Sequence, residues 1–224
     1  SVARLQALAG PDHRMTTQLG RLFIVSAPSG GGKTSLTRAL LPRLAGRNHA
    51  AAISVSYTTR APRAGEIDGE HYHFVDDARF LQMVAAGEFL EHAEVFGRRY
   101  GTGRRRSAEV LEQGTDLILD IDWQGAQQVR AALPETHSVF ILPPSVGELE
   151  RRLSGRGQDD ATTIAGRMAA ARAEISHWDE YDSLIVNDDF ERALEDLGAL
   201  FIAPLLSRDE QTRRQAGLIR DLLD

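Results

Sequence analysis

Short apolar runs alternate along this chain with longer segments in which apolar residues recur every three or four positions. The apolar runs predict strands, because each is bounded by turn-forming or polar residues; they are 21–27, 51–58, 115–122, 137–144 and 183–189. The periodic segments between them predict helices at 33–44, 123–133, 145–154 and 164–178. Such alternation is typical of an α/β fold, a mostly parallel sheet flanked by helices.

Four helical segments carry further local signals. Ser145 and Glu148 form a capping-box pattern at the start of one helix, and Gly46 predicts the end of another. The stripe over 164–178 predicts a core-facing side of one long helix, made by Ile164, Met168, Ala171, Ile175 and Trp178. A second capping box opens the tail at Ser207, and its later leucines and isoleucine predict a single docked C-terminal helix over 207–224.

Composition and charge limit the classes of function. A chain of 224 residues, 42% hydrophobic and 26% charged, is expected to form one sizeable globular domain. The formal net charge of −6 argues against nucleic acid and anionic membranes as partners, and no apolar stretch has the length of a membrane span. Cysteine is absent, which fits a cytoplasmic setting and excludes thiol chemistry. We expect residues 1–20 to be an N-terminal extension, with Met15 as a plausible native start.

The stretch SAPSGGGKTS at 26–35 contains Lys33, the only lysine beside twenty-five arginines. A strand precedes this stretch and a helix follows it, which is the context of a phosphate-binding P-loop. Its glycines allow backbone N–H groups to surround an anion at a helix N-terminus, while the lysine reaches phosphate oxygens. We therefore predict an ATP-binding loop formed by Ala27, Pro28, Ser29, Gly30, Gly31, Gly32, Lys33, Thr34 and Ser35.

Two carboxylates end the strand at 115–122. Asp120 and Asp122 are two residues apart, so on a strand they project to the same face. They also lie where open α/β sheets place their ligands, beyond the carboxyl ends of the strands. Thr34 and Asp120 are accordingly predicted to hold Mg²⁺, which prefers hydroxyl, carboxylate and phosphate oxygens.

The chain resembles the guanylate kinases over about residues 21–201. The resemblance rests on the P-loop and on four further motifs, namely T-T-R-x-P-R-x-G-E at 58–66, Y-G-T at 100–102, L-D-I-D-x-Q-G at 119–125 and V-N-D-D at 186–189. The first position of the P-loop is Ala27, where the strictest pattern has glycine. The resemblance implies Mg²⁺-dependent transfer of a phosphoryl group from ATP to GMP, in purine nucleotide metabolism.

The same resemblance implies a set of GMP-binding residues. Arg60 and Arg63 can clamp the phosphate, and a carboxylate at Glu91 with a hydroxyl at Thr102 can read the guanine edge. The complete expected set is Ser56, Arg60, Arg63, Tyr72, Glu91, Tyr100, Gly101, Thr102 and Asp122.

A second group of arginines resembles the lid that closes over ATP in this family. Arg152, Arg156 and Arg167, together with Lys33 and Arg60, are the residues expected to neutralise charge on the transferred group. The domain organisation implied by the resemblance is a kinase domain at 21–206, with a small mixed insertion for the monophosphate at 56–103 and a helical lid at 151–177. Neither the motifs nor the composition distinguishes a monomer from a homo-oligomer.

Two other functions stay open at this point. Another nucleoside monophosphate kinase would share the P-loop and the lid, and the Glu91 and Thr102 pair is the feature that argues against it. A guanylate-kinase-like protein-binding module would keep the fold without catalysis. Such modules have a degraded ATP loop, whereas Gly32, Lys33 and Thr34 are intact here.

Overall fold

The computed structural model describes residues 19–95, 97–154 and 161–224. The expectations for residues 1–18 and for Arg156 therefore lie outside the described residues. The central sheet contains five strands in the order β2-β7-β1-β8-β9, and every pairing between them is parallel. Their bounds are β1 Leu22–Ser26, β2 Ala51–Ile53, β7 Asp116–Asp120, β8 His137–Leu142 and β9 Ser183–Val186.

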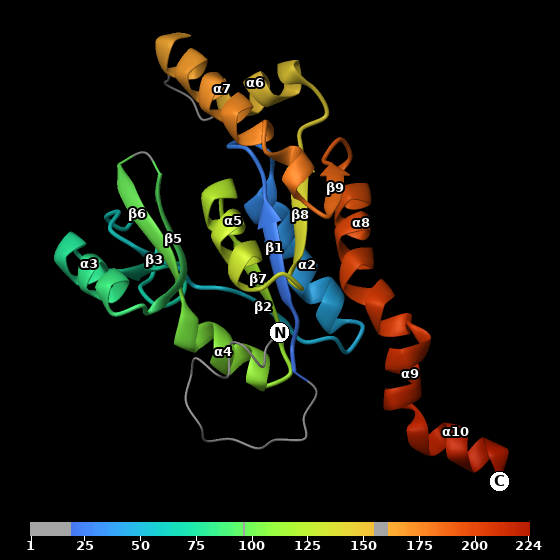
Figure 1. Ribbon diagram of the computed structural model, residues 1–224. Helices are drawn as coiled ribbons and strands as arrows, with labels where there is room; N and C mark the ends of the chain where they lie inside the picture. The colour runs from blue at the N-terminus through green and yellow to red at the C-terminus, as the bar shows by residue number, and fades with distance from the viewer. Residues whose placement is uncertain (1–18, 96, 155–160) are drawn as a thin grey trace.

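Helices cover both faces of this sheet (Figure 1). One face packs against α2 (Lys33–Ala45) and α8 (Phe190–Ile202), and the other against α4 (Arg104–Glu112) and α5 (Trp123–Ala132). Successive residues of β1 alternate between the two cores, Leu22 and Ile24 in one, Phe23 and Val25 in the other. This alternation explains why β1 is apolar from Leu22 to Val25 and buried throughout, since a strand covered on both sides buries every side chain. The predicted α/β fold class is confirmed.

A second, smaller sheet stands beside the first (Figure 1). Its order is β4-β3-β6-β5, with bounds β3 Tyr57–Thr58, β4 His73–Phe74, β5 Phe89–Val95 and β6 Arg98–Gly103. The sheet is mixed, because β3 pairs with β4 in parallel and with β6 antiparallel. Helix α3 (Asp77–Ala85) packs on it through Phe80 and Met83. The strand predicted over 51–58 is thus two strands, one in each sheet.

The segment predicted to be a lid, 151–177, contains the end of α6 (Val146–Ser154) and the whole of α7 (Ala161–Ile175). They pack together through Leu149, Leu153 and Ala171, and the predicted cap of Ser145 accepts a hydrogen bond from the Glu148 N–H. The prediction for Trp178 was wrong. Helix α7 ends at Ile175, Trp178 opens a 3-10 helix (η1, Trp178–Glu180), and its side chain is 47% exposed.

The tail also differs from its prediction of one docked helix. After a 3-10 helix at Ala203–Leu206 (η2), two short helices follow, α9 (Arg208–Arg214) and α10 (Ala216–Leu223), which extend away from the sheet (Figure 1). The apolar side chains of α10 are exposed, those of Leu222 and Leu223 by 75% and 82%. Among the residues described, no helix is both long and apolar enough to cross a membrane.

The N-terminal edge of the central sheet is tied together by Asp116, which is 3% exposed. Its carboxylate accepts hydrogen bonds from the backbone N–H and the guanidinium of Arg21, at 2.6 Å each, and lies 2.8 Å from His49 Nε2. Arg21 also donates to the carbonyl of Phe201 at the end of α8. The buried Asp116 carboxylate therefore joins β7 to the start of β1 and to the segment before β2, and through Arg21 it also reaches α8. These contacts lie at the end of the strands opposite the P-loop.

Replacing this carboxylate should destabilise the fold. Asp116→Ala leaves the Arg21 charge and two N–H groups without their partner, so we expect a loss of about 3 kcal/mol or more in the free energy of unfolding. Urea denaturation measures this loss. The control Asp209→Ala, in an exposed ion pair with Arg208, should change stability by less than about 0.5 kcal/mol. A loss below about 1 kcal/mol for Asp116→Ala contradicts the role given to this network.

Candidate functional site

The loop between β1 and α2 has the backbone shape of a phosphate-binding loop. Gly30 and Gly32 have φ of +84° and +92°, conformations that side chains rarely adopt. Asn187, at the end of β9, donates through Nδ2 to the Gly31 carbonyl at 2.9 Å, and a Cβ on Gly32 would collide with this amide. The loop is therefore both glycine-dependent and fixed from outside by a buried amide.

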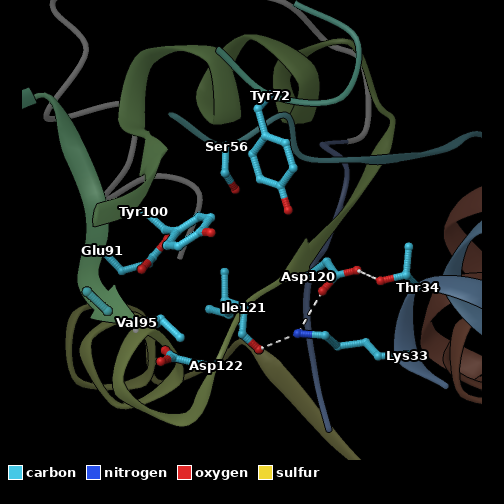
Figure 2. Close-up of a pocket in the computed structure, with 11 residues that line it drawn as sticks. Lys33, Thr34, Ser56, Tyr72, Glu91, Val95, Tyr100, Asp120, Ile121 and Asp122 are labelled. Atoms are coloured by element: carbon cyan, nitrogen blue, oxygen red, sulfur yellow. Dashed lines mark hydrogen bonds and ion pairs between the residues drawn. The ribbon is translucent and has the colours of Figure 1, made fainter. Parts of the chain in front are cut away.

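Lys33 begins α2 and bridges to the end of β7. Its ammonium lies 2.7 Å from Asp120 Oδ1 and donates to the Ile121 carbonyl at 3.0 Å (Figure 2). The Thr34 hydroxyl donates to the other oxygen of Asp120 at 3.3 Å. Burial alone would lower the pKa of Lys33, but the charge and hydrogen bond of Asp120, together with the charges of Asp122 and Glu174, outweigh burial, so the pKa is raised.

Some of the residues predicted for the ATP-binding loop and for the GMP site line one cavity of about 260 Å³, lying between the two sheets. Figure 2 shows the polar side chains that line it, which come from the P-loop, the second sheet, the ends of β3 and β4, and the end of β7. They are Lys33, Thr34, Ser56, Tyr72, Glu91, Tyr100, Asp120 and Asp122. Asp120 is the last residue of β7, but Asp122 has left the strand and caps α5 by accepting from the Gly125 N–H.

Glu91 is 4% exposed and reaches the cavity from β5. It lies opposite Thr102 of β6, whose hydroxyl donates to Glu91 Oε1 at 2.6 Å. Burial raises the pKa of Glu91 to about 7, an effect that Asp122 increases and that the Thr102 hydrogen bond opposes. Gly125 of α5 lies against this carboxylate, because a Cβ there would meet Glu91 Oε2 at 2.6 Å. The two expected base-reading side chains are thus in contact with each other.

The two arginines of the second motif occupy different positions. Arg60 pairs with Glu66 at 2.7 Å, and its guanidinium lies 5.3 Å from the centre of the Tyr72 ring. This pairing holds the pKa of Glu66 at about 2. Arg63 is exposed, and its backbone N–H donates to Glu66. Neither arginine is among the residues that line the cavity. Glu66, which the motif contained without an assigned role, orients this segment.

Arg152, one of the arginines predicted for the lid, contacts Glu148 and the residue that binds the P-loop, Asn187. Its guanidinium donates to Glu148 Oε1 at 2.7 Å and to the backbone carbonyl of Asn187 at 3.0 Å. The residue that holds Gly31 therefore also holds Arg152. Arg167 lies on α7.

Sequence reasoning assigned no role to three residues that shape the site, namely Gly125, Glu174 and Asn187. Glu174 Oε2 accepts from the Ser29 N–H of the P-loop at 2.7 Å. Gly125 and Asn187 stood inside quoted motifs, and Glu174 is the only acidic residue of α7, placed in its last turn. An acidic residue at the negative end of a helix is disfavoured, which was a usable signal.

No group of three His, Cys, Asp or Glu side chains suited to a metal ion is present in the part of the chain that the structure describes. Thr34 and Asp120 nevertheless provide a hydroxyl and a carboxylate beside the P-loop. Mg²⁺ is commonly bound by one or two protein oxygens, with phosphate oxygens and water completing its shell. The donors present fit that mode of binding.

Comparisons with known proteins agree with this geometry. The family model for guanylate kinase matches residues 19–203. Curated guanylate kinases of Vibrio parahaemolyticus and Alkalilimnicola ehrlichii are 55% and 56% identical over 204 residues, 91% of this chain and 98% of each relative. A crystal structure of guanylate kinase from Anaplasma phagocytophilum matches with a TM-score of 0.69 at 34% identity, covering 88% of this chain and 96% of that one. The chain belongs to the guanylate kinase family, whose members are nucleoside monophosphate kinases.

Proposed function

We propose that this protein transfers the γ-phosphoryl group of ATP to GMP, giving ADP and GDP, with ATP on the P-loop and GMP against the second sheet. The observation that carries the proposal is the cavity that joins Lys33 to the buried Glu91. The relatives named guanylate kinase favour this function over another monophosphate kinase and over a binding module without catalysis.

The proposal places the guanine ring at the Glu91 end of the cavity. An ionised Glu91 accepts from guanine N1–H and the N2 amino group, while Thr102, once released from Glu91, donates to O6. Adenine presents an unprotonated N1 and no amino group there, so the carboxylate would lose its partners. Ser56, Tyr72 and Tyr100 lie between this end and Asp120, on the path that the phosphate of GMP would take.

The phosphoryl transfer itself needs positive charge and alignment more than proton transfer, since the attacking phosphate oxygen of GMP is already anionic. Lys33 binds phosphate oxygens of ATP, and Arg60, Arg152, Arg156 and Arg167 neutralise charge on the transferred group. Arg63 joins Arg60 in binding the phosphate of GMP. Thr34 and Asp120 would hold Mg²⁺, which when bound neutralises phosphate charge.

Gly101 permits β6 to pass close to Phe89, as a Cβ would meet that ring at 2.9 Å.

Base selection provides the test of this function. Glu91→Gln keeps the size of the side chain but presents an amide to guanine N1–H and N2, so GMP activity should fall sharply and the GMP/AMP ratio of kcat/KM should narrow. Sites built on such hydrogen bonds discriminate by roughly 10⁴, most of which should be lost. Steady-state assays with both nucleotides, and circular dichroism to confirm folding, measure this. A variant that keeps the parent's ratio removes Glu91 from base recognition.

The lysine of the P-loop should not be replaceable by arginine. Lys33→Arg keeps the charge, but the planar fork does not fit a space bounded by Asp120 and the Ile121 carbonyl. We expect turnover to fall at least about a hundredfold, or about 2.7 kcal/mol at the barrier. Arg38→Lys, the reverse exchange at an exposed position five residues later on α2, is the control and should be neutral. Near-normal turnover of Lys33→Arg would refute the steric argument.

Binding of GMP should weaken as the pH falls through about 7, the pKa of Glu91 in the free protein. Protonation removes the acceptor that guanine needs, so the dissociation constant should rise about tenfold for each pH unit below that pKa. Calorimetric titration of GMP between pH 6 and pH 8.5 measures the effect. The phosphate of GMP also titrates near pH 6, so Glu91→Gln serves as the control. An identical pH profile in parent and variant contradicts the assignment.

A further inference from the structure

A contact between the lid and the P-loop takes no part in the function proposed above. Glu174 of α7 accepts a hydrogen bond from the backbone N–H of Ser29 at 2.7 Å. These residues are 145 positions apart, and Ser29 is the third residue of the P-loop pattern. The contact joins the end of the lid helix directly to the loop that would bind ATP.

The position is an unfavourable one for a carboxylate. Glu174 lies in the last turn of α7, where the helix dipole is negative. Burial raises the pKa of Glu174, while the Ser29 N–H and the Lys33 ammonium oppose that rise. Burial and the dipole both disfavour a charge here, and the hydrogen bond to the loop and the nearby Lys33 charge compensate for them. Because burial and the helix dipole both make a carboxylate at position 174 unfavourable, its presence is better explained by its contact with the P-loop than by a contribution to stability.

Apolar packing beside this hydrogen bond holds the same two parts together. Gly30 lies so close to α6 that a Cβ would meet side-chain carbons of Leu149 and Leu153 at 3.2 Å. Those leucines pack on Ala171 of α7, which is fully buried. The base of the lid therefore rests on the P-loop through apolar contacts, and Glu174 adds a directional hydrogen bond that constrains how α7 is rotated about its axis.

The rotation of α7 about its axis determines the direction in which the Arg167 side chain leaves the helix. Arg167 and Glu174 are seven residues apart on α7, and Ala171 lies between them on the same side. Seven residues are close to two full turns, so these three positions share one face of the helix. Arg167 is then about 10 Å further along the axis, on the face that Glu174 turns toward the P-loop.

We propose that Glu174 is a positioning residue, which fixes the rotation of α7 on the P-loop and so aims Arg167 at the phosphoryl group being transferred. The inference rests on the proposed phosphoryl transfer and on the role of Arg167 in it. It assigns Glu174 no contact with the substrates, because the residue acts through another side chain.

Removing the hydrogen bond should lower turnover without weakening GMP binding. Glu174→Ala is expected to reduce kcat about tenfold or more, since small misplacements of a charge-stabilising group are costly, and to leave the KM for GMP within about twofold. Glu174→Gln keeps an oxygen that accepts from the Ser29 N–H and should retain kcat within about threefold of the parent. The control Glu150→Ala, at an exposed position on α6, should be neutral.

A double-mutant cycle with Arg167→Ala separates positioning from a general structural effect. If Glu174 acts through Arg167, adding Glu174→Ala to Arg167→Ala should lower kcat by less than about twofold. The inference is overturned if the two effects multiply, if Glu174→Ala has parental kcat, or if Glu174→Gln is as impaired as Glu174→Ala. Thermal melting of each variant identifies any loss of kcat that comes from unfolding. If Glu174→Ala is unfolded, the kcat of Glu174→Gln decides whether the hydrogen bond is needed for turnover.

The result of the double-mutant cycle does not depend on which nucleoside monophosphate accepts the phosphoryl group. The cycle is run with ATP and whichever nucleoside monophosphate the parent phosphorylates fastest, so a preference other than GMP contradicts the proposed function without affecting the cycle. The contact is also read without turnover, from the Ser29 amide signal in ¹H–¹⁵N spectra of the nucleotide-free protein. That signal should move in Glu174→Ala and stay closer to its parental position in Glu174→Gln; an unchanged signal in Glu174→Ala overturns the inference.

Discussion

The ion pair between Lys33 and Asp120 is the interaction on which the arrangement of this molecule depends. Parallel pairing of β1 with β7 sets Val25 beside Asp120, so the carboxylate lies level with the start of the P-loop. The ammonium then lies between Asp120 and the Ile121 carbonyl, where a long lysine stem fits and a wider head group does not. A charged group is thus kept in place, inside the cavity, before any phosphate arrives.

The remaining parts of the site are held against this centre by single, well-defined contacts. Asn187 fixes the Gly31 carbonyl and binds Arg152 through its own carbonyl, while Glu174 fixes the Ser29 amide. On the far side of the cavity, Gly125 allows the first turn of α5 to touch the buried Glu91. Preorganised contacts of this kind lower the cost of aligning two polyanionic substrates.

Features that depend on residues close together in the sequence could be predicted, whereas features that depend on residues far apart could not. The P-loop is contiguous at 26–35, and the strands of the central sheet are continuous apolar runs, so both could be predicted. The pairing of Glu91 with Thr102 came from the resemblance, and the register of β5 and β6 provides its geometry. The prediction of a single strand over 51–58 was wrong, because the chain passes from one sheet to the other between Ile53 and Tyr57. The hydrophobic periodicity of the sequence does not reveal such a change of sheet. Contacts such as Glu174 with Ser29 join residues 145 positions apart and leave no local pattern.

The central claim is that one cavity combines a P-loop with a guanine-reading carboxylate. The most direct measurement is the initial rate of ADP formation from ATP with GMP, AMP, UMP, CMP and dTMP as acceptors, each over a full range of concentrations. The account predicts a kcat/KM for GMP that exceeds every other value by roughly 10⁴, because only guanine satisfies the buried carboxylate. Comparable values for GMP and AMP, or a preference for a pyrimidine, would contradict it.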